Sequence, residues 1–232
     1  MATTTIAQAG PAAAMWRDER ITADQASDFA RLIPASRVDR DTIARNLHGF
    51  PAHIKVRGIF FEGLSRVVAS MNGPDAMAAM VAQAGVAPKT TAFRAYPHRD
   101  FYKLYYLAAP LLHPTATMPE ALRLTARTFF PIFRESMLGR TMSALMGDRP
   151  ATLLPLLARA YNVSVEGNDH RVELENANVL SWSCQVEPVD WFADTFTGIV
   201  EGAMPSRLTA EVRVAERTFV DGMARYRFRI RW

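Results

Sequence analysis

The chain has 232 residues, a formal net charge of +4 and 49% hydrophobic residues, enough for one large domain with a substantial core. Its positive charge is mild, so we expect no nucleic-acid partner. The single cysteine, Cys184, has no partner for an intrachain disulfide, which favours a reducing, cytoplasmic setting. The sequence indicates no signal peptide, and no stretch approaches the ~20 apolar residues that span a bilayer.

The first part of the chain is predicted to be an extension, residues 1–50, that precedes the main domain. Residues 1–14 are rich in Ala and Thr and carry no charge, which is typical of a flexible tail. Residues 15–50 show two short helical patterns, one after Thr22 and one after Asp41, and both are typical of surface helices.

Residues 51–232 are predicted to form one α+β domain that begins with helices. After a short β-like run at 54–61, helical patterns continue to about residue 157. The longest of them opens at Pro119, and Pro131 is expected to kink it.

The next stretch is predicted to be a meander of three strands followed by a helix. Tyr161, Val163 and Val165 alternate on the first strand, and a turn at 167–168 would pair Val163 with Val172. The third strand carries apolar side chains on one side from Leu180 to Val186, and a helix is expected after Pro188.

The last residues are predicted to form a hairpin with one apolar and one basic face. The two alternating sets are Tyr226, Phe228, Ile230 and Trp232 against Arg225, Arg227, Arg229 and Arg231. A two-residue Asp221-Gly222 turn would put Val214 opposite Arg229 and mix the faces, so we expect a three-residue loop. In that register Arg217 lies opposite Arg225.

Together these patterns predict an α+β fold. Its C-terminal half would run β-β-β-α-β-β and form an antiparallel twisted sheet, packed against an N-terminal helical layer.

Seven aromatic side chains are candidates for lining a ligand pocket between the helices and the sheet: Tyr102, Tyr105, Tyr106, Phe129, Phe133, Trp182 and Phe196. The alternative is that this set is simply core. Tyrosine hydroxyls need polar partners when they are buried, and that need favours a cavity with polar contents.

Two further features are candidates for partner docking. Gly198 and Gly202 lie four residues apart on one helix and would allow another backbone to approach closely. Arg225, Arg227 and Arg229 would form a basic surface for an acidic partner, the alternative being a solvated sheet face with acidic neighbours.

The stretch from about Ile54 to Trp232 resembles a domain family of unknown function that is abundant in myxobacteria. The resemblance is carried by 56–63, Tyr96-Pro97, 129–139, 196–202 and the closing Tyr-x-Phe-x-Ile-x-Trp of 226–232. More distantly, the 198–202 helix followed by a hairpin is similar to the 4-vinyl reductase domain. The wider fold group includes haem nitric-oxide sensors and subunits of the TRAPP complex. The resemblance implies a domain that binds a small molecule or assembles with proteins.

The chain departs from those relatives at their cofactor residues. It lacks the Tyr-x-Ser-x-Arg motif of the haem sensors, and His113 abuts Pro114 at a helix end, where a capping or surface role is the simpler interpretation. Residues 214–228 contain none of the cysteines that the 4-vinyl reductase pattern often has there. We therefore expect no cofactor, no metal site and no catalytic residues.

The sequence thus predicts a non-enzymatic sensory or regulatory domain that binds a small apolar ligand. The alternative is an interaction module that forms a homodimer or docks on an acidic protein.

Overall fold

The computed structural model describes residues 21–87, 89–135, 140 and 149–232. The helices in these ranges are α1 (Ala23–Arg31), α2 (Arg37–Gly49), α3 (Ile59–Asn72), α4 (Pro74–Ala84), α5 (His98–Leu112), α6 (Met118–Arg127), α7 (Phe129–Glu135), α9 (Pro150–Ser164) and α10 (Phe192–Ala203). The strands are β1 (Lys55–Arg57), β2 (Ala95–Pro97), β3 (Val165–Glu166), β4 (Asp169–Asn176), β5 (Val179–Val186), β6 (Glu211–Val220) and β7 (Met223–Arg231).

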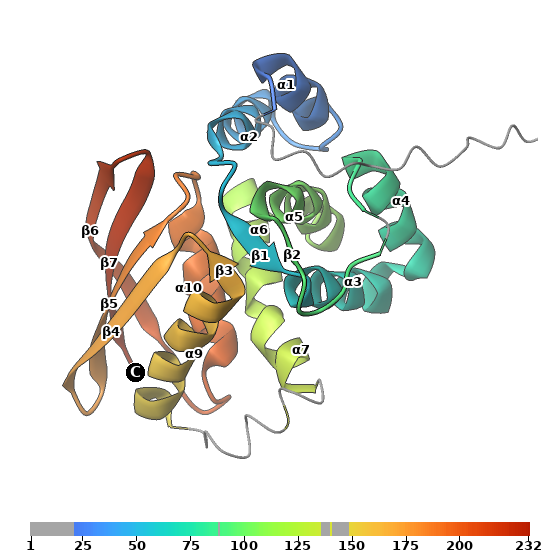
Figure 1. Cartoon of the computed structure of the whole chain (residues 1–232). Helices are drawn as coiled ribbons and strands as arrows, with labels where there is room; N and C mark the ends of the chain where they lie inside the picture. Colours follow the sequence, from blue (N-terminus) through green and yellow to red (C-terminus); the bar gives the residue numbers. More distant parts are fainter. Residues whose placement is uncertain (1–20, 88, 136–139, 141–148) are drawn as a thin grey trace, which may run out of the picture.

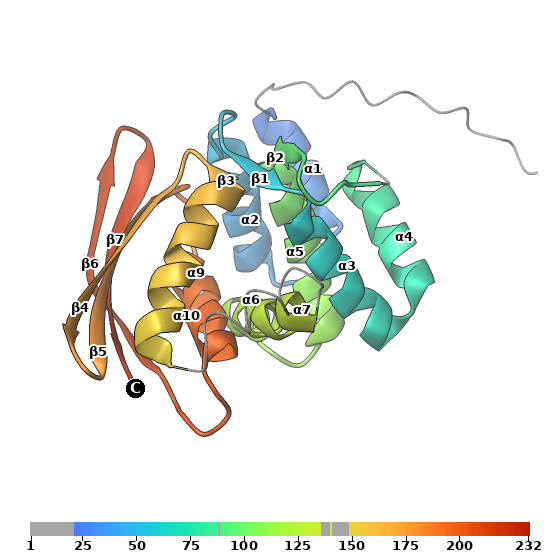
Figure 2. The same cartoon turned by 60° about the horizontal axis from the view of Figure 1, so that its bottom comes forward.

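The strands form two antiparallel sheets, a small one in the order β2-β1-β3 and a larger one in the order β4-β5-β7-β6. Helices α9 and α10 lie on one face of the larger sheet, and the other helices lie beyond them (Figures 1 and 2). No described element covers the opposite face of that sheet. Each described helix is too short or too polar to cross a membrane.

The inner face of the larger sheet is the floor of the core. Trp182 on β5 and Phe228 and Ile230 on β7 are fully buried there, because their side chains point toward α10. Phe196 of α10 stacks on Phe228 with ring centroids 4.1 Å apart. The predicted α+β fold and the inward-facing apolar side of the last strand are confirmed.

The hairpin between β6 and β7 differs from the prediction in its turn. Asp221 and Gly222 form a two-residue turn with positive φ angles of 53° and 75°, so Val220 pairs with Met223. A bulge at Ala215 then shifts the register by one residue, and Val214 faces Phe228 after all. The expected three-residue loop is wrong, because the extra residue that keeps the apolar sides together lies within β6.

The predicted first strand of the meander is also wrong, since α9 continues through Ser164. Val163 is 72% exposed, and Val172 pairs with Trp182 rather than with Val163. Tyr161 packs as a helical residue against Phe60, with ring centroids 5.8 Å apart. Alternation over three residues is a weak signal beside a long helix that can continue to bury Tyr161.

The predicted long helix is interrupted near Pro131, as expected. Helix α6 ends at Arg127 and α7 begins at Phe129, with Thr128 between them. A proline cannot donate to the carbonyl four residues earlier, which is that of Arg127, so the helix breaks at this point.

The two predicted N-terminal helices are present as α1 and α2, and their apolar sides are buried. Ala26, Ile43 and Leu47 are fully buried and belong to the same hydrophobic core as the main domain. The N-terminal helix pair therefore packs on the rest of the described chain.

Candidate functional site

The seven predicted pocket residues pack in three groups. Tyr102, Tyr105 and Tyr106 are buried on α5, and the ring of Tyr105 lies 5.7 Å from that of Phe129. Trp182 and Phe196 form a second group with centroids 5.0 Å apart, between the sheet and α10. Phe133 lies apart from both, packing with Phe130 at 6.3 Å. In these groups the rings belong to the hydrophobic core clusters or pack against them.

The three tyrosine hydroxyls of α5 are all bound by protein groups. Tyr105 donates to the carbonyl oxygen of Leu122, and the hydroxyl of Tyr106 accepts from the Asn46 side chain at 3.0 Å. Tyr102 donates to Glu187 Oε1 at 2.8 Å. Burial raises the pKa of all three hydroxyls, so they stay neutral.

Glu187 is the centre of a buried polar network. Its side chain is 1% exposed, and its second oxygen, Oε2, accepts from Asn168 Nδ2 at 3.0 Å. His98 Nδ1 lies 3.7 Å from Glu187 Oε1, and burial lowers the pKa of His98 although the carboxylate opposes that shift. The described chain thus holds Glu187 with neutral donors instead of a permanent cation.

His170 occupies a second buried position in this region. Its Nδ1 accepts a hydrogen bond from Trp182 Nε1 at 3.1 Å, which satisfies the indole deep in the core. Burial lowers the pKa of His170 to about 4, with Glu187 and Asp169 opposing the shift. His170 is therefore neutral at physiological pH.

The segment from Glu187 to Trp191 connects this network to the surface. The backbone N–H of Asp190 donates to Asn46 Oδ1 at 3.0 Å, and Asn46 in turn binds Tyr106. Trp191 has a φ angle of +66°, which is unusual for a bulky residue and costs energy. The segment is thereby anchored to both α2 and α5.

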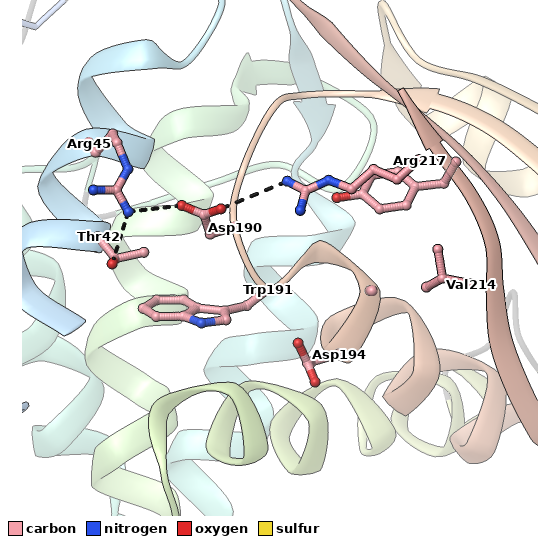
Figure 3. Close-up of a pocket in the computed structure, with 9 residues that line it drawn as sticks. Thr42, Arg45, Asp190, Trp191, Asp194, Val214 and Arg217 are labelled. Atoms are coloured by element: carbon pink, nitrogen blue, oxygen red, sulfur yellow. Dashed lines mark hydrogen bonds and ion pairs between the residues drawn. The ribbon is translucent and has the colours of Figure 1, made fainter. Parts of the chain in front are cut away.

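A cleft with a volume of about 490 Å³ opens beside this segment (Figure 3). Its lining comes from α2, from the start of α10 and the preceding segment, and from β6 and β7: Thr42, Arg45, Asp190, Trp191, Ala193, Asp194, Val214, Arg217 and Tyr226. These stretches are far apart in the sequence, so only the folded chain forms the cleft.

Two arginines approach Asp190 from opposite sides of the cleft (Figure 3). Arg45 Nη2 lies 3.2 Å from Asp190 Oδ2 and also donates to Thr42 Oγ1 at 3.1 Å. Arg217 Nη2 lies 3.8 Å from Asp190 Oδ1, and its guanidinium carbon lies 5.4 Å from the centre of the Tyr226 ring. The arrangement holds two cations around one carboxylate.

The bulge at Ala215 places Arg217 in this cleft. With the expected loop Arg217 would face Arg225 on the outer side of the sheet, whereas in the observed register it pairs with Tyr226, whose side chain points inward. Bulges commonly redirect side chains next to functional sites. The sequence signal for this bulge was the Asp221-Gly222 pair, which strongly favours a two-residue turn. With that turn, the apolar sides stay together only if β6 contains one extra residue.

Sequence analysis missed the other charged residues of this region as well. Arg45, Asp190, Asp194 and Glu187 belong to no recognisable motif. Only their convergence in space distinguishes them.

The glycine pair predicted for docking is used within the chain. A Cβ atom at Gly198 would lie 2.1 Å from the carbonyl oxygen of Arg123, and one at Gly202 would lie 2.1 Å from that of Arg127. Helix α6 therefore packs on the glycine face of α10, which the sequence analysis had proposed as a docking surface for a partner. The close approach of a second backbone was anticipated, but that backbone belongs to the same chain.

The predicted basic face lies on the uncovered side of the larger sheet. Arg225, Arg227 and Arg229 alternate there along β7, and all three are exposed. Arg229 pairs with Glu175 at 3.1 Å, and Arg225 donates to Gln185 at 3.0 Å. Among the described residues no ion pair involves Arg227.

Comparison with known proteins identifies both a family and a fold. Residues 52–232 match the family described as "Protein of unknown function (DUF2378)". No curated protein matches the chain.

The solved structures that match include H-NOX domains. One is an oxygen-binding H-NOX domain related to soluble guanylate cyclases, in its oxygen complex: 16% identity, TM-score 0.59, covering 75% of this chain and 94% of that one. Another is a mutant structure of the T. tengcongensis H-NOX: 16% identity, TM-score 0.56, covering 75% and 95%. A third comes from work on haem redox potential and porphyrin distortion: 16% identity, TM-score 0.60, covering 76% and 99%. At this identity the likeness establishes the fold, and the similarities to 4-vinyl reductase and TRAPP subunits stay predictions.

The two buried histidines, His98 and His170, do not fit a haem. An axial imidazole needs a nitrogen facing a space wide enough for the macrocycle. The ring centroid of Tyr102 lies 5.1 Å from that of His98, and the ring centroid of Trp182 lies 5.9 Å from that of His170, so packed side chains surround both imidazoles. His113 is half-buried and is the C-cap residue of α5, in agreement with the predicted capping role. No group of three or more metal-binding side chains occurs among the described residues.

Proposed function

The chain belongs to the DUF2378 family of proteins of unknown function, and from that premise we propose that it is a non-enzymatic sensory domain that binds a small molecule in the cleft beside Asp190. The H-NOX fold supports a sensory role, since it is the fold of an oxygen-binding domain related to soluble guanylate cyclases. The proposed site is not the aromatic pocket of the sequence analysis, since none of the seven aromatic residues lines this cleft.

The observation that carries the proposal is the position of the Glu187–Trp191 segment. One side of it lines the cleft through Asp190 and Trp191, and the other side holds Glu187 in the buried network. The backbone N–H of Asp190 is hydrogen-bonded to Asn46, so a molecule that changes the side-chain contacts of Asp190 also acts on that hydrogen bond. The segment therefore couples occupancy of the cleft to the packing of α2 and α5.

The cleft is of a size and composition that suit a small ligand. Ligand pockets commonly measure 300–1,000 Å³ and combine apolar walls with a few polar groups. The apolar wall here is made by Trp191, Ala193, Val214 and Tyr226, and the polar groups are the two arginines and two aspartates.

The test is to fill the cleft with a larger side chain. Native mass spectrometry of the purified protein, followed by thermal-shift screening of small metabolites, should reveal a bound or stabilising molecule with the wild type. Ala193→Phe should abolish that binding, because the ring takes the ligand's place. Ala79→Phe on the exposed side of α4 is the matched control and should leave it unchanged. Equal binding by the Ala193→Phe variant would refute the cleft as the site.

A second candidate function is an interaction module that uses the basic face of the larger sheet. The observation favouring it is the row of exposed arginines on β7, of which Arg227 makes no ion pair within the described chain. A labelled Glu-rich peptide should bind at low salt, and the double change Arg227→Gln with Arg229→Gln should abolish its fluorescence anisotropy signal. Arg159→Gln on α9 is the control, and an equal loss there would reduce the effect to net charge alone. Light scattering that finds only monomer would count against a homodimer.

A further inference from the structure

We propose that the ligand of the cleft is a small aromatic acid, whose single anionic group is bound by Arg45 and Arg217 and whose ring lies against Trp191. This inference rests on the proposed function and deepens it by naming the chemical class of the ligand. The arguments are the unused donors of the two arginines, the exchangeable ion pairs, the charge at the far end of the cleft and the aromatic wall.

The two guanidinium groups have many donors that Asp190 does not use. A guanidinium presents five N–H groups, arranged as a fork that suits a carboxylate or phosphate. Arg45 uses only Nη2, for Asp190 and Thr42. Arg217 makes no hydrogen bond to a described residue, and its nearest approach to Asp190 is 3.8 Å. The remaining N–H groups at this end of the cleft lack a protein acceptor within the described chain.

The existing ion pairs can be exchanged for contacts to a ligand. The side chain of Arg45 is 66% exposed, that of Arg217 is 41% exposed and that of Asp190 is 37% exposed. Ion pairs exposed to this degree are weak, because water screens them. An incoming anion with better geometry can therefore share or replace Asp190 as the acceptor for both arginines.

The rest of the cleft limits the ligand to one anionic group. Asp194 lies in the first turn of α10 and lines the cleft away from the Arg45 side chain (Figure 3). Its pKa is raised by burial, although its own backbone N–H and Arg123 oppose that shift. A second negative group placed there would meet this carboxylate, whereas a neutral ring or a hydrogen-bond donor would not.

The aromatic wall suits a flat molecule. The positive φ of Trp191 turns its indole into the cleft lining, and Tyr106 supports the indole edge-on with centroids 6.4 Å apart. Rings prefer offset or edge-to-face contact with such a wall. Tyr226 beneath Arg217 already shows the same preference for a planar group over a ring.

Helix α2 makes recognition of the acid depend on the N-terminal helix pair. Thr42 and Arg45 precede residue 52, at which the match to the family begins. Thr42 orients the Arg45 guanidinium through its hydroxyl at 3.1 Å. One of the two arginines is therefore supplied by a part of this chain that the family match does not include.

The test uses three matched probes: 2-naphthoate, 2-naphthamide and 2-naphthylmethylamine. Each is titrated to millimolar concentration into the ¹⁵N-labelled full chain while the indole N–H resonance of Trp191 is followed, assigned with Trp191→Phe. We expect the acid to shift this resonance in a saturable manner and to bind at least about tenfold more tightly than the amide or the amine. Arg45→Gln and Arg217→Gln should each weaken the acid about tenfold and leave the amide unchanged. Arg213→Gln, which alters an exposed arginine outside the cleft, is the control.

The outcomes separate the two proposals. If the amide or the amine binds as well as the acid, the anionic class is wrong while a ligand site in the cleft stands. If the acid binds but neither arginine variant weakens it, the assignment of Arg45 and Arg217 is wrong. If none of the three probes shifts the Trp191 resonance, the aromatic acid is refuted as the ligand class, while the cleft as a ligand site is decided by the metabolite screen with the wild type and Ala193→Phe.

Discussion

Glu187 and Asp190 are two carboxylates three residues apart on one connecting segment, and they differ in burial and in the kind of partner that each binds. Glu187 is 1% exposed and is held by the neutral donors of Tyr102 and Asn168. Asp190 is 37% exposed and lies between two arginines that it binds loosely. A buried carboxylate must keep its partners because nothing else can replace them, while an exposed one can exchange them with a ligand or water.

The comparison is tested most severely by removing the buried carboxylate. Glu187→Ala deprives the Tyr102 hydroxyl and the Asn168 amide of their acceptor and leaves a small cavity. We expect a loss of about 3 kcal/mol in the free energy of unfolding, measured by urea denaturation. A loss below about 0.5 kcal/mol would mean that water or other groups replace the acceptor, contrary to the burial of the site.

Acid should lower the free energy of unfolding through His170, which is buried near Glu187. Its pKa in the folded chain is about 4, below the usual 6.5, so the unfolded chain binds more protons between these values. This contribution to stability is complete above pH 6.5 and falls as the pH drops to 4, by up to about 3 kcal/mol. The imidazole titration followed by NMR should give the low pKa, and His170→Gln should reduce the slope of stability against pH. A His170 pKa near 6.5 would contradict the prediction.

The packing that fixes the position of α10 behind the segment can be tested at its glycines. Gly198→Ala puts a methyl group against the carbonyl oxygen of Arg123, and because both groups are parts of packed helices we expect a loss of about 2 kcal/mol. Gly63→Ala in α3 is the matched control. Nothing lies within 4 Å of a Cβ atom at Gly63, so that change should raise stability by about 0.5–1 kcal/mol. Equal effects in thermal unfolding would show that α6 and α10 can move apart freely.

The smallest effect is expected at the exposed carboxylate. Asp190→Ala removes two loose ion pairs but leaves its backbone N–H bonded to Asn46, so the loss of stability should be below about 1 kcal/mol. The same variant should bind 2-naphthoate more tightly, because Asp190 no longer competes for the arginines. A loss as large as that of Glu187→Ala would abolish the distinction between the two carboxylates.

Much of the fold could be predicted from local patterns because each pattern has one stable solution. The alternation from Tyr226 to Trp232 requires an apolar side to be buried, and the stripe on α10 requires a sheet to bury it against. The α+β class, the order from β4 through α10 to β7 and the helix break at Pro131 follow from such local requirements. The strand predicted at 161–165 failed because its alternation was short and the preceding helix had an equally apolar continuation.

The candidate site could not be predicted in this way, because no local sequence pattern requires any of its residues to lie near the others. Arg45, Asp190 and Arg217 are ordinary surface charges in their own segments, and no spacing along the chain links them. The seven aromatic residues were the more conspicuous pattern in the sequence. Large rings bury the most apolar area, however, and they therefore pack into the hydrophobic core.

The sequence by itself determined which sides of its helices and strands must leave water, since that choice depends on the period of apolar residues alone. The tertiary structure decided where the leftover charges meet. A two-residue turn at Asp221-Gly222 and a bulge at Ala215 moved Arg217 to the inner side of β6, and packing of α2 brought Arg45 to the opposite wall. Register and docking are global properties, because each depends on how the whole chain satisfies its buried surface at once.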